Sequence, residues 1–209
     1  PKDVPALVET LERKNRTVEE RARKLQYDKG GLIEAKVAEA LGDMPDPSSV
    51  EPLLAALKQF DEMPSYINDP RKQQAFVMSG VQKIISIASA LASIGDERAV
   101  DALLGILEDK ELVLEHKLAA VQQLAFLGSQ KAVPGLMKAL AKMPDAEDPV
   151  SNGLHVQIAL NTANLVDGSD PKAVAALDKQ LATIQATIAK WIDAAEKKRA
   201  AAADPQEKA

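Results

Sequence analysis

Residues 90–104, with the sequence ALASIGDERAVDALL, decide the fold of this chain. An apolar segment ends at Gly95, Asp96 follows at once, and Val100 and Leu103 then stand three residues apart, as on one face of a helix. Glycine is favoured where a helix ends in a left-handed residue, and aspartate is favoured as the cap of the next helix. The stretch therefore predicts two helices that are joined by a tight turn.

The same pattern recurs along the whole chain. When Val50, Val100, Val133 and Val174 are set in register, leucine stands nine residues before each valine and three and seven residues after it. Asp or Ser stands four residues before each valine, as a cap candidate. A truncated copy is centred on Val4. Such self-similarity is the signature of a repeat protein.

One helix pair cannot bury its apolar stripe alone, so the pairs must stack on their neighbours. We therefore predict an all-α, right-handed α-solenoid of about four and a half repeats with a long C-terminal helix. The expected boundaries are a half repeat over 1–16, repeats over about 17–62, 72–110, 111–143 and 150–182, an extension of the last helix over 183–203, and a disordered tail over 204–209.

Residues 90–104 and 124–134 resemble HEAT repeats, in particular the short bacterial kind first named from phycobilin lyases. The resemblance covers roughly residues 1–182. It implies a solenoid of HEAT type, and it implies little about the partner because such arrays serve many assemblies.

Composition excludes several classes of site. Aromatic residues make up 3% of the 209 residues, which leaves Leu, Ile, Val and Ala to build the core. Cysteine is absent and there are two histidines, so a thiolate site or a multi-histidine metal centre cannot be assembled. The net charge of −5 argues against nucleic acid as the main partner. The sequence contains no run of 18 or more apolar residues, so it predicts no transmembrane segment.

The favoured function is protein–protein binding, as a scaffold or as an accessory subunit of a larger assembly. Stacked helix pairs expose a long concave face that is lined by the second helix of each pair. The polar residues on these second helices are the predicted partner contacts. They are Glu51, Lys58, Asp101, Glu108, Lys138 and Lys142.

An inserted segment over residues 60–71 offers a second contact edge. It holds apolar residues between two prolines, and loops on one face of a solenoid are often the binding ones. The candidates are Met63, Tyr66 and Ile67. A loop insertion without a binding role, or a segment that folds back on the array, explains the same pattern.

The last helix carries a heptad seam that continues far past the final repeat. One interpretation is a cap that lies along the array and covers its apolar end. The alternative is a homo-oligomer in which the part beyond Ile184 pairs with another chain. Both interpretations rest on Ile184, Ile188, Trp191 and Ile192.

Catalysis is not expected, and no cofactor or metal is expected either. Neighbouring helix residues such as Glu115 and His116 do not face each other, so we expect an ordinary helix surface there and a cap role for His155. HEAT-like hydroxylases use paired His-Glu motifs, which this chain lacks, and nothing marks the bilin site of a lyase. An enzyme of either kind remains the less favoured alternative.

Neither the compartment nor the partner follows from the sequence. The chain begins with Pro, so we expect a processed or truncated N-terminus. A cytoplasmic and a periplasmic location are both compatible with the absence of cysteine.

Overall fold

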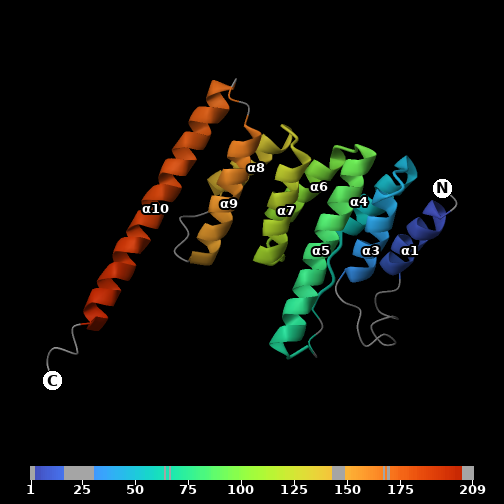
Figure 1. Ribbon diagram of the computed structural model, residues 1–209, viewed down its shortest axis with the longest axis horizontal. Coiled ribbons are helices and arrows are strands. Elements are labelled where there is room, and N and C mark those ends of the chain that lie inside the picture. Colours follow the sequence, from blue (N-terminus) through green and yellow to red (C-terminus); the bar gives the residue numbers. More distant parts are fainter. Residues whose placement is uncertain are drawn as a thin grey trace.

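The computed structural model describes residues 3–16, 31–63, 65, 67–142, 149–166, 168 and 170–203. Within these ranges every regular element is helical (Figure 1). The elements are α1 (Val4–Arg16), α3 (Leu32–Gly42), the short 3-10 helix η1 (Pro47–Ser49), α4 (Val50–Lys58), α5 (Pro70–Ile94), α6 (Arg98–Glu108), α7 (Leu114–Leu127), α8 (Ala132–Lys142), α9 (Pro149–Leu165) and α10 (Pro171–Ala203).

The helices form two layers that follow the order of the repeats. The first helices of the pairs, α3, α5, α7 and α9, pack side by side in that order. The second helices, α4, α6, α8 and α10, form the other layer and also contact one another in order. At the N-terminal end α1 packs on α3 and α4. The predicted all-α solenoid is confirmed.

The turns within the pairs use the capping residues that the repeat register predicts. Gly95 and Gly128 end α5 and α7 with φ of 82° and 65°, in the left-handed region that glycine adopts without strain. The Asp96 carboxylate accepts a hydrogen bond from the Arg98 backbone N–H at 2.9 Å. Equivalent bonds are made by Asp46 and Asp170 to the backbone two residues on, at 2.8 and 3.0 Å. These local contacts fix where each second helix begins.

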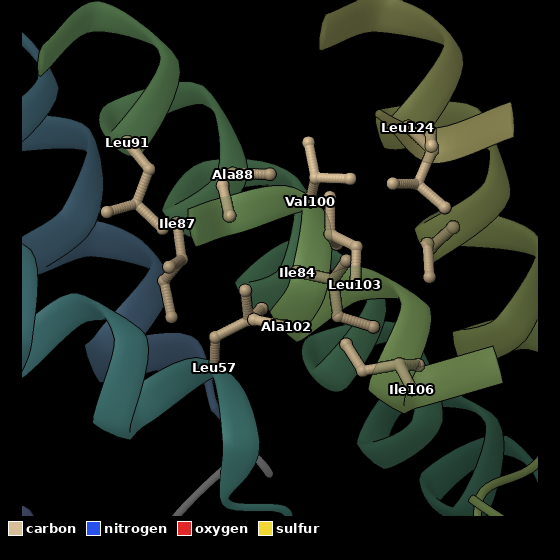
Figure 2. Close-up of a cluster of buried hydrophobic side chains, with 14 of the residues drawn as sticks. Leu57, Ile84, Ile87, Ala88, Leu91, Val100, Ala102, Leu103, Ile106 and Leu124 are labelled. Carbon is tan, nitrogen blue, oxygen red and sulfur yellow. The ribbon is translucent and has the colours of Figure 1, made fainter. Parts of the chain in front are cut away.

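The core runs continuously from pair to pair. Figure 2 shows Leu57 of α4, Ile87 of α5 and Leu103 of α6 converging on one apolar cluster, which reaches Leu124 of α7. All four of these side chains are fully buried. Because they come from four helices in three repeats, each pair completes the core of its neighbour.

Ser49 is a buried polar residue that departs from the apolar pattern of its repeat position. It stands one residue before Val50, where Ala99 and Ala132 stand in the next two repeats, and all three residues are fully buried. The Ser49 hydroxyl has no hydrogen-bond partner among the described residues. An unpartnered buried hydroxyl destabilises a fold.

We therefore expect Ser49→Ala to raise the free energy of unfolding by about 1 kcal/mol. Urea denaturation followed by circular dichroism measures the change. Ser48→Ala is the matched control, because Ser48 is exposed and its Oγ donates to Asp46 at 2.6 Å, so this variant should not stabilise the protein. A loss of stability in Ser49→Ala would show that its hydroxyl is satisfied in solution.

The helix α5 has the length and apolar composition of a membrane span. Core helices of soluble folds share these properties, and half of the apolar stretch is buried within the protein. The helix packs between α3 and α7, which cover part of its apolar surface, while Met78 is 47% exposed.

Candidate functional site: the second-helix face

Charged side chains connect one repeat to the next on the surface of the second helices. The Arg98 guanidinium donates to the carboxylate of Glu51, which lies on α4 of the preceding repeat. In the following repeat, Lys131 Nζ lies 2.8 Å from Asp101 Oδ2 on α6. Each acid stands one residue after its repeat valine, and each base stands two residues before the next one. The two ion pairs therefore occupy the same register in successive repeats.

A third group lies nearer the C-terminal ends of α6 and α8. The Glu108 carboxylate accepts hydrogen bonds from Lys138 at 2.8 Å and from Lys142 at 3.3 Å. We call these seven residues the inter-repeat ladder: Glu51, Arg98, Asp101, Lys131, Glu108, Lys138 and Lys142. The ladder spans three repeats.

In several ladder residues the pKa is shifted in favour of the charged form. The hydrogen bond from Lys138, followed by that from Lys142, lowers the pKa of Glu108 below its ordinary value. The hydrogen bond to Asp101 raises the pKa of Lys131, and the bond to Glu108 raises that of Lys138. All of these side chains are well exposed, so each pair adds little to stability. Their main consequence is a fixed pattern of both signs on one face.

Five of the six residues predicted on the second helices belong to this ladder. The sixth, Lys58, is exposed at the end of α4 and makes no ion pair with the described residues. Sequence reasoning missed Arg98 and Lys131, which precede their repeat valines by two residues. Their constant register was the signal that would have found them.

The inserted segment over residues 60–71 is described only in part. Met63 is exposed, Ile67 is half-buried, and the Ile67 carbonyl accepts a hydrogen bond from Gln73 Nε2 at 2.9 Å. Tyr66 lies outside the described residues. The insertion therefore folds back at Ile67 onto the start of α5, which begins at Pro70.

A shallow groove lies between the turn that joins α5 to α6 and the turn that joins α7 to α8. It has a volume of about 550 Å³ and is lined by Asp96, Glu97, Phe126 and Lys131, among others. The Phe126 side chain is 70% exposed, which is unusual for a large aromatic residue. Sequence reasoning assigned no role to Phe126, because only the turn geometry shows that it faces solvent.

The expectation of a surface histidine at position 116 was wrong. The His116 imidazole is buried between α7 and α5, where its Nε2 lies 3.2 Å from the Val77 carbonyl. Its ring centre lies 5.0 Å from that of Phe60. Gly80 makes room for the ring, since a Cβ atom at Gly80 would lie 3.0 Å from Cε1 of the imidazole and still closer to Nε2. Glu115 is exposed and does not pair with the imidazole.

The second histidine also differs from its prediction. His155 is buried within α9 and does not serve as a cap residue. Within the described ranges, no three His, Asp or Glu side chains are grouped as they would be around a metal ion.

Burial lowers the pKa of His116 below 6.5, and the nearby positive charge of Lys83 acts in the same direction. The Val77 carbonyl and Glu115 oppose this shift without cancelling it. Unfolding exposes the imidazole, which then binds a proton at its ordinary pKa of about 6.5. Protons therefore favour the unfolded chain below that pH.

We expect the free energy of unfolding to be unaffected by His116 above about pH 6.5 and to fall as the pH drops towards its lower folded-state pKa. Urea denaturation between pH 7.5 and about pH 5, chosen to bracket that ordinary pKa, measures the slope. His116→Gln should flatten it, because the amide keeps a donor for Val77 and does not titrate. An equal slope in both proteins would contradict the assignment.

The last helix divides into two halves. Ile184 still packs against the core. Beyond it Ile188 and Trp191 are half-buried and Ile192 is 55% exposed, and none of the three belongs to the core. The expected extension of the last helix is therefore present up to Ala203.

Comparison with known proteins supports the repeat architecture directly. Residues 84–149 match the family of HEAT repeats, and residues 35–59 match the PBS lyase HEAT-like repeat. The first match covers the C-terminal part of α5 together with α6, α7 and α8, and the second covers most of α3 and all of α4. No curated protein matched the chain. Together with the stacked helix pairs, the two matches show that this chain contains HEAT repeats over residues 35–59 and 84–149.

Proposed function

We propose that this chain is a non-catalytic scaffold or accessory subunit that binds a partner protein on its second-helix face. HEAT repeats are generally protein-interaction modules, which supports a protein as the partner. The inter-repeat ladder is the observation that supports this face as the contact surface. It presents acidic and basic groups in a fixed order across three repeats.

The geometry of the ladder favours a protein surface over a small ligand. The ladder extends over α4, α6 and α8, and its side chains are open to solvent. A small ligand needs an enclosing pocket, whereas an extended array of exposed charges matches a broad partner surface. Since both signs are present, specificity comes from the order of the charges.

The test separates the charge pattern from the fold. In the double variant Asp101→Lys/Lys131→Asp, the ion pair is kept but its direction is reversed. The control Asp193→Lys/Lys197→Asp reverses an exposed pair on α10, where the two groups lie 2.7 Å apart. Each tagged protein is used for affinity capture from the source cells, followed by mass spectrometry.

We expect the wild type and the α10 control to capture the same partner at a fixed stoichiometry. The Asp101/Lys131 swap should lose it, with unchanged circular dichroism and thermal midpoint. Full capture by the swapped variant would place the contact elsewhere, and failure of the wild type to capture any protein would contradict the scaffold function.

A further inference from the structure

The groove between the two intra-pair turns brings an exposed aromatic ring and a carboxylate into one place. Phe126 lies at the end of α7 and Glu97 lies in the turn that leads into α6, and both line the groove. The Phe126 side chain is 70% exposed and the Glu97 side chain is exposed as well. The two residues come from neighbouring repeats, so only the stacking of the repeats brings them to the same groove.

The packing of the repeats does not explain Phe126. It stands seven residues before its repeat valine, and the same position holds Asp43 and Ser93 in two other repeats. Both of these residues are polar and exposed, so a helix pair needs no apolar side chain at this position. A single exposed apolar residue is common on protein surfaces and assigns no site by itself. The argument for a ligand therefore needs the charge beside the ring.

Glu97 carries the charge that the groove leaves uncompensated. Its side chain does not cap α6, because Asp96 accepts from the backbone there, and it forms no hydrogen bond or ion pair with the described residues. Asp96 is paired with the Arg98 guanidinium at 2.9 Å, and Lys131 is bonded to Asp101 at 2.8 Å. Every other charged residue that lines the groove thus has a partner of opposite sign.

The surroundings of the groove are acidic as a whole. Four carboxylates stand against two cations at this end of the ladder: Glu51, Asp96, Glu97 and Asp101 against Arg98 and Lys131. Such an excess of negative charge attracts a cation and repels an anion. An aromatic face also attracts a cation. The ring and the charge therefore select the same kind of occupant.

We propose that this groove binds an arginine side chain of the partner protein, with the guanidinium on the Glu97 carboxylate and its flat face against the Phe126 ring. The proposal rests on the proposed function, since it names the chemistry that recognises the partner beside the ladder. A guanidinium can form two parallel hydrogen bonds with a carboxylate and stack on an aromatic ring. The ammonium of lysine is compact and strongly hydrated, and it cannot do both.

The probe for the groove is acetyl-arginine amide, which is titrated into the isotope-labelled full chain and followed by NMR. The backbone amides of Gly95 and Gly128, which line the groove, should shift in a saturable way. Acetyl-citrulline amide has nearly the same shape without the charge, and it should give no saturable shift. Equal shifts with both compounds, or no saturable shift with acetyl-arginine amide, would overturn the proposal.

Two variants assign the binding to the ring and the carboxylate. Glu97→Gln should abolish the saturable shifts and Phe126→Ala should weaken them, with unchanged circular dichroism in both proteins. Glu115→Gln is the matched control, because it neutralises an exposed carboxylate at the opposite end of α7, and it should bind as the wild type does. Wild-type binding by Glu97→Gln would contradict the assignment.

Affinity capture from the source cells separates this proposal from the scaffold function. Glu97→Lys should recover at least about tenfold less of the partner than the wild type, as expected for a central interface contact, and Glu115→Lys should recover the wild-type amount. Full recovery by Glu97→Lys would overturn the arginine contact and leave the scaffold function standing. Failure of the wild type to capture any protein would contradict both, even if acetyl-arginine amide binds.

Discussion

Leu103→Ala is expected to lower the free energy of unfolding by about 2–5 kcal/mol, because it opens a cavity where three repeats meet. The Leu103 side chain is fully buried in the centre of the cluster in Figure 2. Urea denaturation measures the loss. Leu104→Ala is the matched control, since Leu104 is the next residue on the same helix and is half-buried, and it should cost clearly less. Equal losses would contradict the orientation of α6.

The loss at Leu103 should also be local. In a solenoid each repeat contacts only its neighbours, so a defect weakens nearby helices most. Hydrogen exchange should accelerate in α4 to α7 and change little in α10. Uniform acceleration along the chain would indicate one globular cooperative unit.

Gly80→Val is expected to lower the free energy of unfolding by about 1–3 kcal/mol through overpacking. The new side chain would occupy the space of the His116 imidazole, which lies against Gly80 between α5 and α7. Thermal and urea denaturation measure the effect. Gly105→Val is the control, since Gly105 also lies within a helix but nothing stands within 4 Å of an added Cβ there. Similar losses in both variants would contradict crowding against His116 as the cause.

A second substitution tests the same contact independently. Removing the imidazole in Gly80→Val/His116→Ala should restore part of the loss, so the two substitutions should be non-additive by about 1 kcal/mol or more. Additive losses would mean that Gly80 and His116 do not share one space in solution.

The turns and the repeat register were predictable from the sequence because their causes are local. Asp96 caps a helix by accepting a hydrogen bond from a backbone N–H two residues away. Gly95 adopts a left-handed conformation because glycine has no Cβ to hinder it. The valine and leucine positions repeat because every helix pair must bury the same apolar stripe against the neighbouring pairs. Such signals need no knowledge of distant residues.

The inter-repeat contacts could not be predicted in the same way. The pairing of Asp101 with Lys131 depends on how far one repeat is rotated against the next, which no single repeat encodes. His116 is buried because Gly80, in a different repeat, leaves a space for it. A charged or polar residue on a helix could therefore be recognised from the sequence. Its contacts could not, because they are made with residues of the neighbouring repeat.

The most direct test of the proposed function is hydrogen exchange of this chain with and without its captured partner. The second helices α4, α6 and α8 give peptides separate from those of the first helices. The scaffold account predicts slower exchange in residues 50–58, 98–108 and 132–142 on binding. Protection confined to α3, α5 and α7, with the second helices unchanged, would contradict the assignment of the binding face.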